Sequence, residues 1–259
     1  LDIDYLDKES MLDLYPWLTD WKFLSHDPVD MYSGAWVYSN TDLNLNGGMG
    51  GLAFKRSYFS LNNNMKNMLG YGWSHNYNIY AQVHSSTELG YGLRQPQDAV
   101  AMIAASTVIQ DIMQETPSLK SWMTGSLIAK WGMDQLKDNA VSVHLENDVL
   151  TYVKHPDGSY ATPPGITSRL LRDGDHYRID ERFSRTILFN AENKVIRITD
   201  ADGNQVNFTY DSGLLANVAD SFSHSLTFNY TGGLLTSVTD STGRGVSFGY
   251  DGNSDLITC

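Results

Sequence analysis

A twenty-residue spacing of aromatic and acidic residues constrains the last quarter of this chain more than any other feature. Three residue types recur in one phase: Tyr210, Tyr230 and Tyr250; Phe208, Phe228 and Phe248; and Asp200, Asp220 and Asp240. A fixed period of this length marks a repeat array, in which each unit buries its apolar face against its neighbours. The spacing therefore predicts a structural scaffold in this region.

Each unit has the pattern of a β-hairpin. Val206, Phe208 and Tyr210 alternate with polar residues, which is typical of a strand with one buried face. A turn with one or two glycines, such as Asp211-Ser212-Gly213, follows each tyrosine, and a second strand comes next. Equal phase places the repeated Phe and Tyr side chains on one face. We expect each aromatic ring to stack on its counterpart in the next unit.

A fourth, degenerate copy is expected upstream of these three. Asp180 keeps the phase, Leu188 takes the phenylalanine position and Asn190 takes the tyrosine position. Hairpins are therefore expected from about residue 144 onward.

Two sets of motifs carry a resemblance to a known family. Phe-x-Tyr-Asp followed by Gly-x-Leu, at residues 208–214, resembles the tyrosine-aspartate (YD) repeat of bacterial RHS proteins, insect-toxin C components and animal teneurins. An ordered series of motifs also resembles the N-terminal domain of RHS proteins. The series is Asp27-Pro28-Val29-Asp30, Ser33-Gly34, Thr41-Asp42-Leu43, Arg56-Ser57-Tyr58 and Gly70-Tyr71-Gly72-Trp73-Ser74-His75. The resemblance covers residues 26–92 and 144–259 and implies a hollow, curled β shell.

These patterns divide the chain into four parts. Residues 1–25 form an acidic, aromatic, amphipathic segment, and residues 26–92 form a β domain similar to the N-terminal domain of RHS proteins. Residues 93–140 form a helical insertion, and residues 141–259 form linking strands and YD-type hairpin repeats. The expected fold is mainly β, with antiparallel β-hairpin repeats forming part of a curled RHS-type shell and one inserted helical hairpin.

The helical insertion is predicted from its spacing of apolar residues. Residues 99–113 have apolar side chains at helical intervals, Thr116-Pro117 marks a break, and residues 119–136 continue with an apolar face. The methionine and tryptophan content suggests a cofactor or membrane surface as one interpretation. The simpler interpretation, which we favour, is a helix pair packed on or inside the β scaffold. Charged residues interrupt the apolar runs, so no transmembrane helix is expected.

Charge and composition limit the partners. The chain has a formal net charge of −12 and 19% charged residues, without a stripe of Lys and Arg. This balance disfavours nucleic acid and anionic membrane surfaces. The single cysteine, Cys259, excludes an intrachain disulfide and a cysteine-rich metal site.

No catalytic, cofactor-binding or metal-binding residues are predicted. The seven histidines fall in no zinc-hydrolase pattern, and Ser74 and His75 are adjacent on a strand and point to opposite faces. Asp200-x-Asp202-x-Asn204 resembles the start of a calcium loop but lacks the later glycine and glutamate, so a hairpin turn is the better interpretation. The glycine run at residues 47–51 lacks the Lys-Ser/Thr of a phosphate loop and is interpreted as a turn. The Gly-rich motif before His75 is interpreted as a tight bend into a strand.

Two functions follow as hypotheses. The resemblance implies a non-catalytic scaffold, the N-terminal portion of a secreted or cell-surface bacterial shell that encloses or presents a C-terminal effector or toxin. The alternative is an extracellular module that binds carbohydrate or a protein partner through exposed aromatic residues. The chain ends inside a repeat, at Ile257-Thr258-Cys259, so the remainder of the polypeptide or a partner chain is expected to cover the last strand.

Overall fold

The structure is a computed structural model of the 259-residue chain. It describes residues 29–30, 34–45, 51–86, 96–113, 118–145, 148–155, 157–182 and 185–259. The amphipathic segment expected at residues 1–25, the motif residues Asp27 and Pro28, and residues 47–50 of the glycine run lie outside this description. Strand accounts for 51% and helix for 17% of the structure, so the prediction of a mainly β fold is confirmed.

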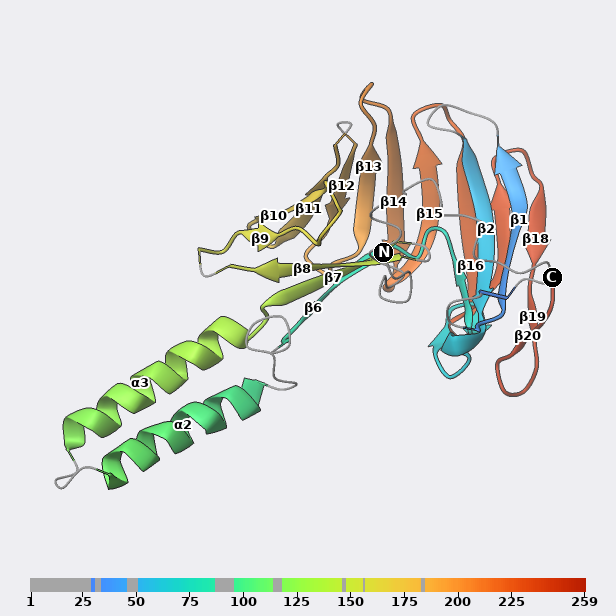
Figure 1. Ribbon diagram of the computed structural model, residues 1–259. Helices are drawn as coiled ribbons and strands as arrows, with labels where there is room; N and C mark the ends of the chain where they lie inside the picture. The colour runs from blue at the N-terminus through green and yellow to red at the C-terminus, as the bar shows by residue number, and fades with distance from the viewer. Residues whose placement is uncertain are drawn as a thin grey trace, which may run out of the picture.

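Nine antiparallel strands of the C-terminal part form one curled sheet (Figure 1). Each strand pairs with its neighbours in sequence, so the sheet is a meander that grows along the chain. The strands are β10 (Arg169–Asp173), β11 (His176–Asp180), β12 (Thr186–Phe189), β13 (Val195–Thr199), β14 (Gln205–Asp211), β15 (Leu214–Asp220), β16 (Ser225–Thr231), β17 (Leu234–Asp240) and β18 (Gly245–Ser247).

Two-residue turns close the hairpins β14–β15 and β16–β17. Ser212 and Gly213 have φ of 49° and 82°, and Gly232 and Gly233 have φ of 59° and 81°. Two consecutive residues at positive φ are the signature of the type I′ turn, whose twist suits antiparallel strands. The turns follow Tyr210 and Tyr230, as the repeat pattern predicts.

Each of these hairpins also contains a β-bulge at the same place. The register shifts between Thr209 and Tyr210 in one repeat and between Asn229 and Tyr230 in the next. A bulge adds a residue to one strand, which bends the strand and increases its twist. The repeat therefore bends the sheet by a similar amount at each copy, which agrees with the curl seen in Figure 1.

The repeated aromatic residues share one face, but direct stacking between counterparts is wrong. Phe208, Phe228 and Phe248 are buried, with 4–6% of their surface exposed. The rings of Phe228 and Phe208 make no contact with each other, because strand β15 separates their strands and places Val218 opposite Phe208. Equivalent strands are thus two strand spacings apart, about 9.6 Å, which exceeds the reach of ring stacking.

The upstream copy also differs from the expected phase. The buried residues of β12 are Ile187 and Phe189, each fully buried, whereas Leu188 is half-buried on the opposite face. Asn190 lies in the following turn instead of a strand. A one-residue shift exchanges the two faces of a strand, so the twenty-residue phase places Leu188 on the wrong face.

A small N-terminal sheet packs over the last repeats. It consists of β1 (Val37–Leu45), β2 (Leu52–Phe59) and β5 (Trp73–His75), in the order β1-β2-β5. A 3-10 turn at Ser60–Asn62 and the short hairpin of β3 (Lys66–Asn67) and β4 (Gly70–Tyr71) connect β2 to β5. In Figure 1, β1 and β2 lie in front of β16 and β18, and the contacts between these strands agree. A last hairpin, β19 (Gly249–Tyr250) and β20 (Leu256–Thr258), follows β18.

A four-stranded sheet links the N-terminal sheet to the nine-stranded sheet. Its strands are β6 (Tyr80–His84), β7 (Ala140–Leu145), β8 (Asp148–Lys154) and β9 (Tyr160–Ala161). Strand β6 also meets the turn after β12, where Ala81 N–H donates to Asn193 O at 2.8 Å. One hydrophobic core runs through all three sheets.

The predicted helical hairpin is confirmed, but its expected packing on or inside the β scaffold is wrong. The helices α2 (Pro96–Ile112) and α3 (Leu119–Leu136) come between β6 and β7 in the sequence. They project away from the sheets (Figure 1). Each helix packs mainly against the other. Spacing alone identifies the helices and their shared face, and it carries no information on which surface covers them. Within the described residues, neither helix has the length and apolarity needed to cross a membrane.

Candidate interaction surface

Phe54 of β2 is the centre of the interface between the N-terminal sheet and the repeats. Its ring is fully buried and lies 5.9 Å from the rings of both Phe228 and Phe248. Tyr77, two residues after β5, lies 6.0 Å from Phe208 and 6.2 Å from Phe228. The repeated phenylalanines therefore contact rings of the N-terminal sheet, and two consecutive repeats share each partner.

The predicted motif glycine Gly70 allows a close approach of two backbones. Its φ is 91°, and a Cβ atom at this position would lie 2.5 Å from the Ser254 carbonyl oxygen in the last hairpin. Nearby, Leu235 N–H donates to Met68 O at 2.7 Å, and the Tyr250 hydroxyl donates to Leu235 O at 2.6 Å. This part of the motif thus docks the β3–β4 hairpin onto the last two repeats.

His75, the last residue of the motif, is buried in the same interface. Its ring is 1% exposed and packs against both Phe54 and Phe228, with ring centres 5.6 Å and 5.9 Å away. Nδ1 accepts a hydrogen bond from the Tyr77 N–H at 3.2 Å, which places the ring proton on Nε2. Nε2 has no hydrogen-bond partner among the described residues. Burial lowers the pKa of His75 to about 4, so the ring is neutral near pH 7.

A row of aromatic side chains extends from this interface across the N-terminal sheet. The pairing register places Tyr38 opposite Tyr58 and Tyr58 opposite Trp73, so the three rings form one line across β1, β2 and β5. Tyr58 and Trp73 lie 5.3 Å apart, and Trp36 stacks on Tyr38 at 5.9 Å. Trp36 and Tyr38 are 42% and 36% exposed, so this aromatic row reaches the solvent.

Gly72 is required for the packing of this aromatic row. It has φ of 72°, and a Cβ atom would lie 2.6 Å from the ring of Tyr58. The glycine at the predicted tight bend of the Gly-Tyr-Gly-Trp motif therefore has a second role, because any side chain at position 72 would displace Tyr58. The other predicted residue of this region, Gly34, lies in an exposed turn, where its N–H donates to Asp30 O at 2.7 Å.

Arg56 lies beside the aromatic row and is held by a buried ion pair. Its Nε donates to Asp42 Oδ2 at 2.7 Å, and both side chains are at most 7% exposed. The guanidinium lies 5.1 Å from the centre of the Trp73 ring, within the range of a cation–π contact. It also donates to Cys259 Sγ at 2.7 Å, so the arginine connects the N-terminal sheet to the residue that follows the last strand.

The predicted acidic positions Asp200, Asp220 and Asp240 shape the turns between repeats. In each turn one carboxylate oxygen accepts hydrogen bonds from the backbone N–H groups two and four residues later, at 2.8–3.0 Å. The other oxygen of each carboxylate binds the side chain four residues later, which is Asn204, His224 or Arg244. The carboxylates are therefore saturated by their own turns, which agrees with a hairpin turn in place of a calcium loop.

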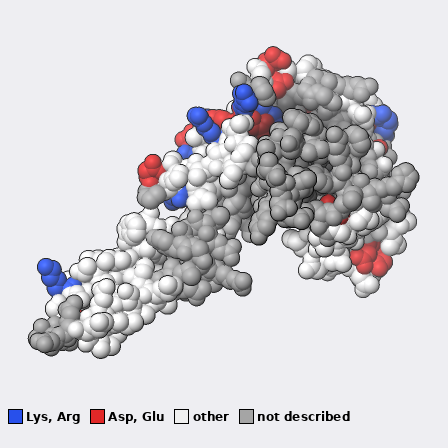
Figure 2. All heavy atoms as spheres, viewed as in Figure 1, with Lys and Arg blue, Asp and Glu red and all other residues white. Residues whose placement is uncertain are grey.

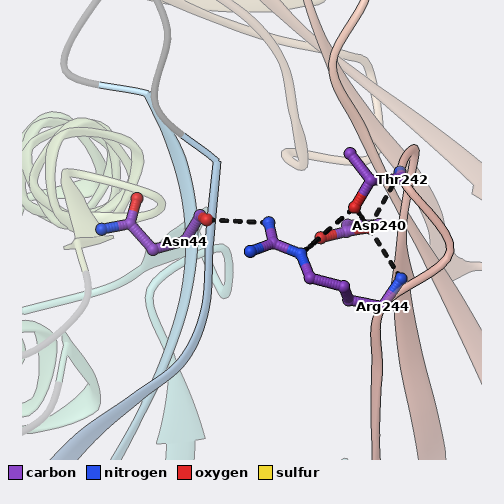
Figure 3. Close-up of polar contacts among 4 residues, drawn as sticks. All are labelled: Asn44, Asp240, Thr242 and Arg244. Carbon is purple, nitrogen blue, oxygen red and sulfur yellow. Dashed lines mark hydrogen bonds and ion pairs between the residues drawn. The ribbon is translucent and has the colours of Figure 1, made fainter.

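The last of these turns reaches the N-terminal sheet (Figure 3). Arg244 Nε donates to Asp240 Oδ2 at 2.7 Å, and one of its Nη atoms donates to the Asn44 carbonyl oxygen of β1 at 2.9 Å. Burial alone would raise the pKa of Asp240, but the hydrogen bonds from Thr242 and Arg244 outweigh it and lower the pKa to about 2. The carboxylate therefore stays ionised and holds the arginine towards β1.

The described residues bring together no cluster of metal-ligating side chains. Within them, no group of three or more His, Cys, Asp and Glu side chains is close enough to hold a metal ion. His84 and His144 lie near each other on β6 and β7, where His84 Nε2 contacts the Ser142 hydroxyl and His144 stacks on Tyr80 at 4.3 Å. Neither ring faces a carboxylate that would complete a catalytic set among the described contacts.

Sequence reasoning missed the residues that join the N-terminal sheet to the repeats. Phe54 and Tyr77 lie outside the motifs that carry the resemblance. Trp36 and Tyr38 lie outside them too, between the Ser33-Gly34 and Thr41-Asp42-Leu43 motifs. The signal that could have found them is the alternation of large side chains at Trp36 and Tyr38 on one strand, and at Phe54, Arg56 and Tyr58 on the next. Alternation identifies the residues that share a face of a strand. It does not identify the strands that pack on that face, which here belong to distant repeats.

Comparison with known families gives one match. Residues 26–101 match a family model described as a domain of unknown function, DUF6531. A comparison with curated proteins finds no match. The matched segment contains the N-terminal sheet and the beginning of helix α2, so this region of the chain is similar to a domain whose function is not assigned.

Proposed function

We propose that this chain is a non-catalytic structural scaffold, the N-terminal portion of an RHS/YD-repeat shell that encloses or presents a C-terminal effector or toxin. A shell of this kind needs a curled sheet that grows by the addition of equivalent units. It also needs a second part of the chain to cover the apolar face of the sheet. The repeats supply equivalent hairpins with a bulge at the same position, and the N-terminal sheet covers the apolar face of the last repeats.

The observation that carries the proposal is the shared contact of successive repeats with one N-terminal ring. Phe228 and Phe248 both lie 5.9 Å from Phe54. Removal of this contact would separate the N-terminal sheet from two repeats at once. A self-contained binding domain would need no such coupling between a repeated hairpin unit and a separate sheet.

The test uses the complete polypeptide that contains this chain. Electron microscopy is expected to show a hollow closed body, and limited proteolysis is expected to spare the segment that follows the repeats. Phe54→Asp should open the body and make that segment sensitive to protease, whereas Gln82→Asp, at an exposed position on β6, should leave it protected. An extended, open β structure in the wild-type protein would overturn the proposal.

The aromatic row favours one alternative, a module that binds carbohydrate. Exposed Trp36 and Tyr38 stack on each other beside Tyr58 and form an apolar surface, and Asn40 adds a polar group next to it. Glycan-array binding by the 259-residue chain that is lost in Trp36→Ala, with the fold unchanged, would support this function. Absence of glycan binding together with a closed body would favour the shell.

A further inference from the structure

The outer side of helix α3 carries an exposed apolar stripe. Met123, Leu127 and Trp131 are spaced by four residues and are 58%, 66% and 56% exposed. Residues four apart on a helix lie on one side, so the three side chains form a continuous surface. We define Met123, Leu127 and Trp131 as the α3 stripe. Figure 2 shows the helical hairpin as largely free of charged side chains on the face in view.

The α3 stripe has no role in holding the two helices together. The opposite side of α3 packs on α2 through buried Gly125 and Gly132, with Thr107 of α2 against Gly125. Trp122 Nε1 also donates to the buried carboxylate of Asp111 on α2. The hairpin is therefore complete without the stripe, and each helix packs mainly against the other. A contiguous exposed apolar patch often marks an interaction site.

Opposite charges stand at the two ends of the stripe. Lys120 lies seven residues before Leu127, and Asp134 lies seven residues after it. Both are exposed, and a separation of seven residues keeps them on the side of the helix that carries Leu127. Asp134 already pairs with Lys130 at 2.6 Å, but more than half of both side chains stays exposed, so the carboxylate can accept a second cation.

This arrangement is complementary to itself when one copy is reversed. With Leu127 opposite Leu127 of a second copy in antiparallel order, Lys120 of one helix faces Asp134 of the other, and Met123 faces Trp131. Antiparallel pairing about a two-fold axis uses the same surface twice. Parallel pairing would instead place Lys120 opposite Lys120 and Asp134 opposite Asp134.

We propose that the α3 stripe is a docking surface for a second copy of this chain, which pairs the two α3 helices in antiparallel order around Leu127. The four helices then lie in one row, α2-α3-α3-α2, with the two α3 helices in contact at the centre. The charge of the chain favours this contact over others, because a net charge of −12 opposes the approach of two copies through acidic surfaces. Helix α3 carries Lys120 and Lys130 beside Asp134, so its charges do not add to that repulsion.

The experiment measures the mass of the 259-residue chain in solution across a range of concentrations, by light scattering and sedimentation equilibrium. The wild-type chain is expected to dimerise. Leu127→Glu places two carboxylates at the axis and should weaken dimerisation by roughly a hundredfold or more. Ile109→Glu is the matched control, because Ile109 is 57% exposed on α2, outside the proposed contact, and should leave dimerisation unchanged. Circular dichroism of both variants should retain the helical signal.

Charge exchange tests the antiparallel order. Lys120→Glu should weaken dimerisation by about fivefold, since two exposed ion pairs become repulsive. Adding Asp134→Lys to that variant should recover the loss. A chain that stays monomeric at high concentration would overturn the proposal, as would a dimer that Leu127→Glu leaves intact. A monomer that binds neutral phosphatidylcholine vesicles and loses binding in both Leu127→Glu and Ile109→Glu would assign the surface to lipid instead.

Discussion

The repeat sheet and the helical hairpin both carry large apolar residues at regular intervals, yet they place them differently. In the repeats, Phe208, Phe228 and Phe248 are buried beneath the N-terminal sheet. In the hairpin, Leu127 and Ile109 remain exposed after the two helices have packed. The difference teaches that periodicity identifies the residues that share a face, whereas a second surface elsewhere in the chain or in another chain decides whether that face is covered.

The largest effect should come from the covered face of the sheet. Phe228→Ala removes a ring that contacts Phe54, His75 and Tyr77, and it should lower the free energy of unfolding by about 3–5 kcal/mol, because the cavity forms between two sheets. Denaturant unfolding followed by tryptophan fluorescence measures the change. A loss below about 1 kcal/mol would mean that the N-terminal sheet and the repeats do not share a core.

The next effect is the dependence of this interface on pH. The pKa of His75 is lowered to about 4 from 6.5, so the unfolded chain binds the proton more readily than the folded chain. Stability should therefore fall as the pH drops from 6.5 to about 4, by about 3 kcal/mol in total. Unfolding free energies measured at several pH values test this.

The control for the pH dependence is His75→Asn, whose side-chain oxygen can still accept from Tyr77 N–H. This variant should lose most of the slope between pH 6.5 and 4. A smaller slope should remain, because burial also lowers the pKa of His144. Losses below pH 3.8 have another origin, since the folded-state pKa of Asp240 is about 2 and its protonation weakens the turn. An unchanged slope in His75→Asn would argue against His75 as the source.

A smaller effect is expected from Gly72→Ala. The new Cβ would meet the Tyr58 ring, and alanine at positive φ is itself unfavourable, so the loss should be about 1–3 kcal/mol. Gly158→Ala is the matched control, because Gly158 has φ of 87° and open space around its Cβ position. The difference between the two unfolding free energies isolates the contact with Tyr58. Equal losses would show that this contact adds nothing to the backbone effect.

The smallest effect should come from the exposed face of the hairpin. Leu127→Ala should change the free energy of unfolding of the monomer by no more than about 0.5 kcal/mol, since the side chain is already exposed. The measurement needs a concentration low enough to keep the chain monomeric. A loss as large as that of Phe228→Ala would mean that Leu127 is covered within its own chain, and the contrast between the two regions would disappear.

Local patterns were sufficient to predict the hairpins, the turns and the helix pair. The alternation at Val206, Phe208 and Tyr210 and the glycines after the tyrosines determine strands and turns through neighbouring residues alone. The upstream copy was assigned to the wrong face because β12 is short, and a shift of one residue between Leu188 and Ile187 exchanges inside and outside.

Contacts between distant segments could not be predicted in this way. Phe54 and Phe228 are separated by more than half of the chain, and no spacing within either segment reveals the other. The stacking expected between Phe208 and Phe228 overlooked the intervening strand that carries Val218. Local periodicity also does not show whether another part of the chain covers the α2–α3 hairpin, so it could not predict that the two helices pack mainly against each other.

The turn carboxylates have a consequence for how such a repeat can change over evolutionary time. Asp200, Asp220 and Asp240 bind an amide, an imidazole and a guanidinium at the fourth following residue, while the hydrogen bonds to the backbone stay the same. The backbone of the turn therefore does not depend on which donor fills that position. One residue per repeat is free to vary in length and charge without altering the hairpin, and Arg244 shows that such a residue can reach a neighbouring strand. Successive repeats can in this way acquire different neighbours while they keep one shape.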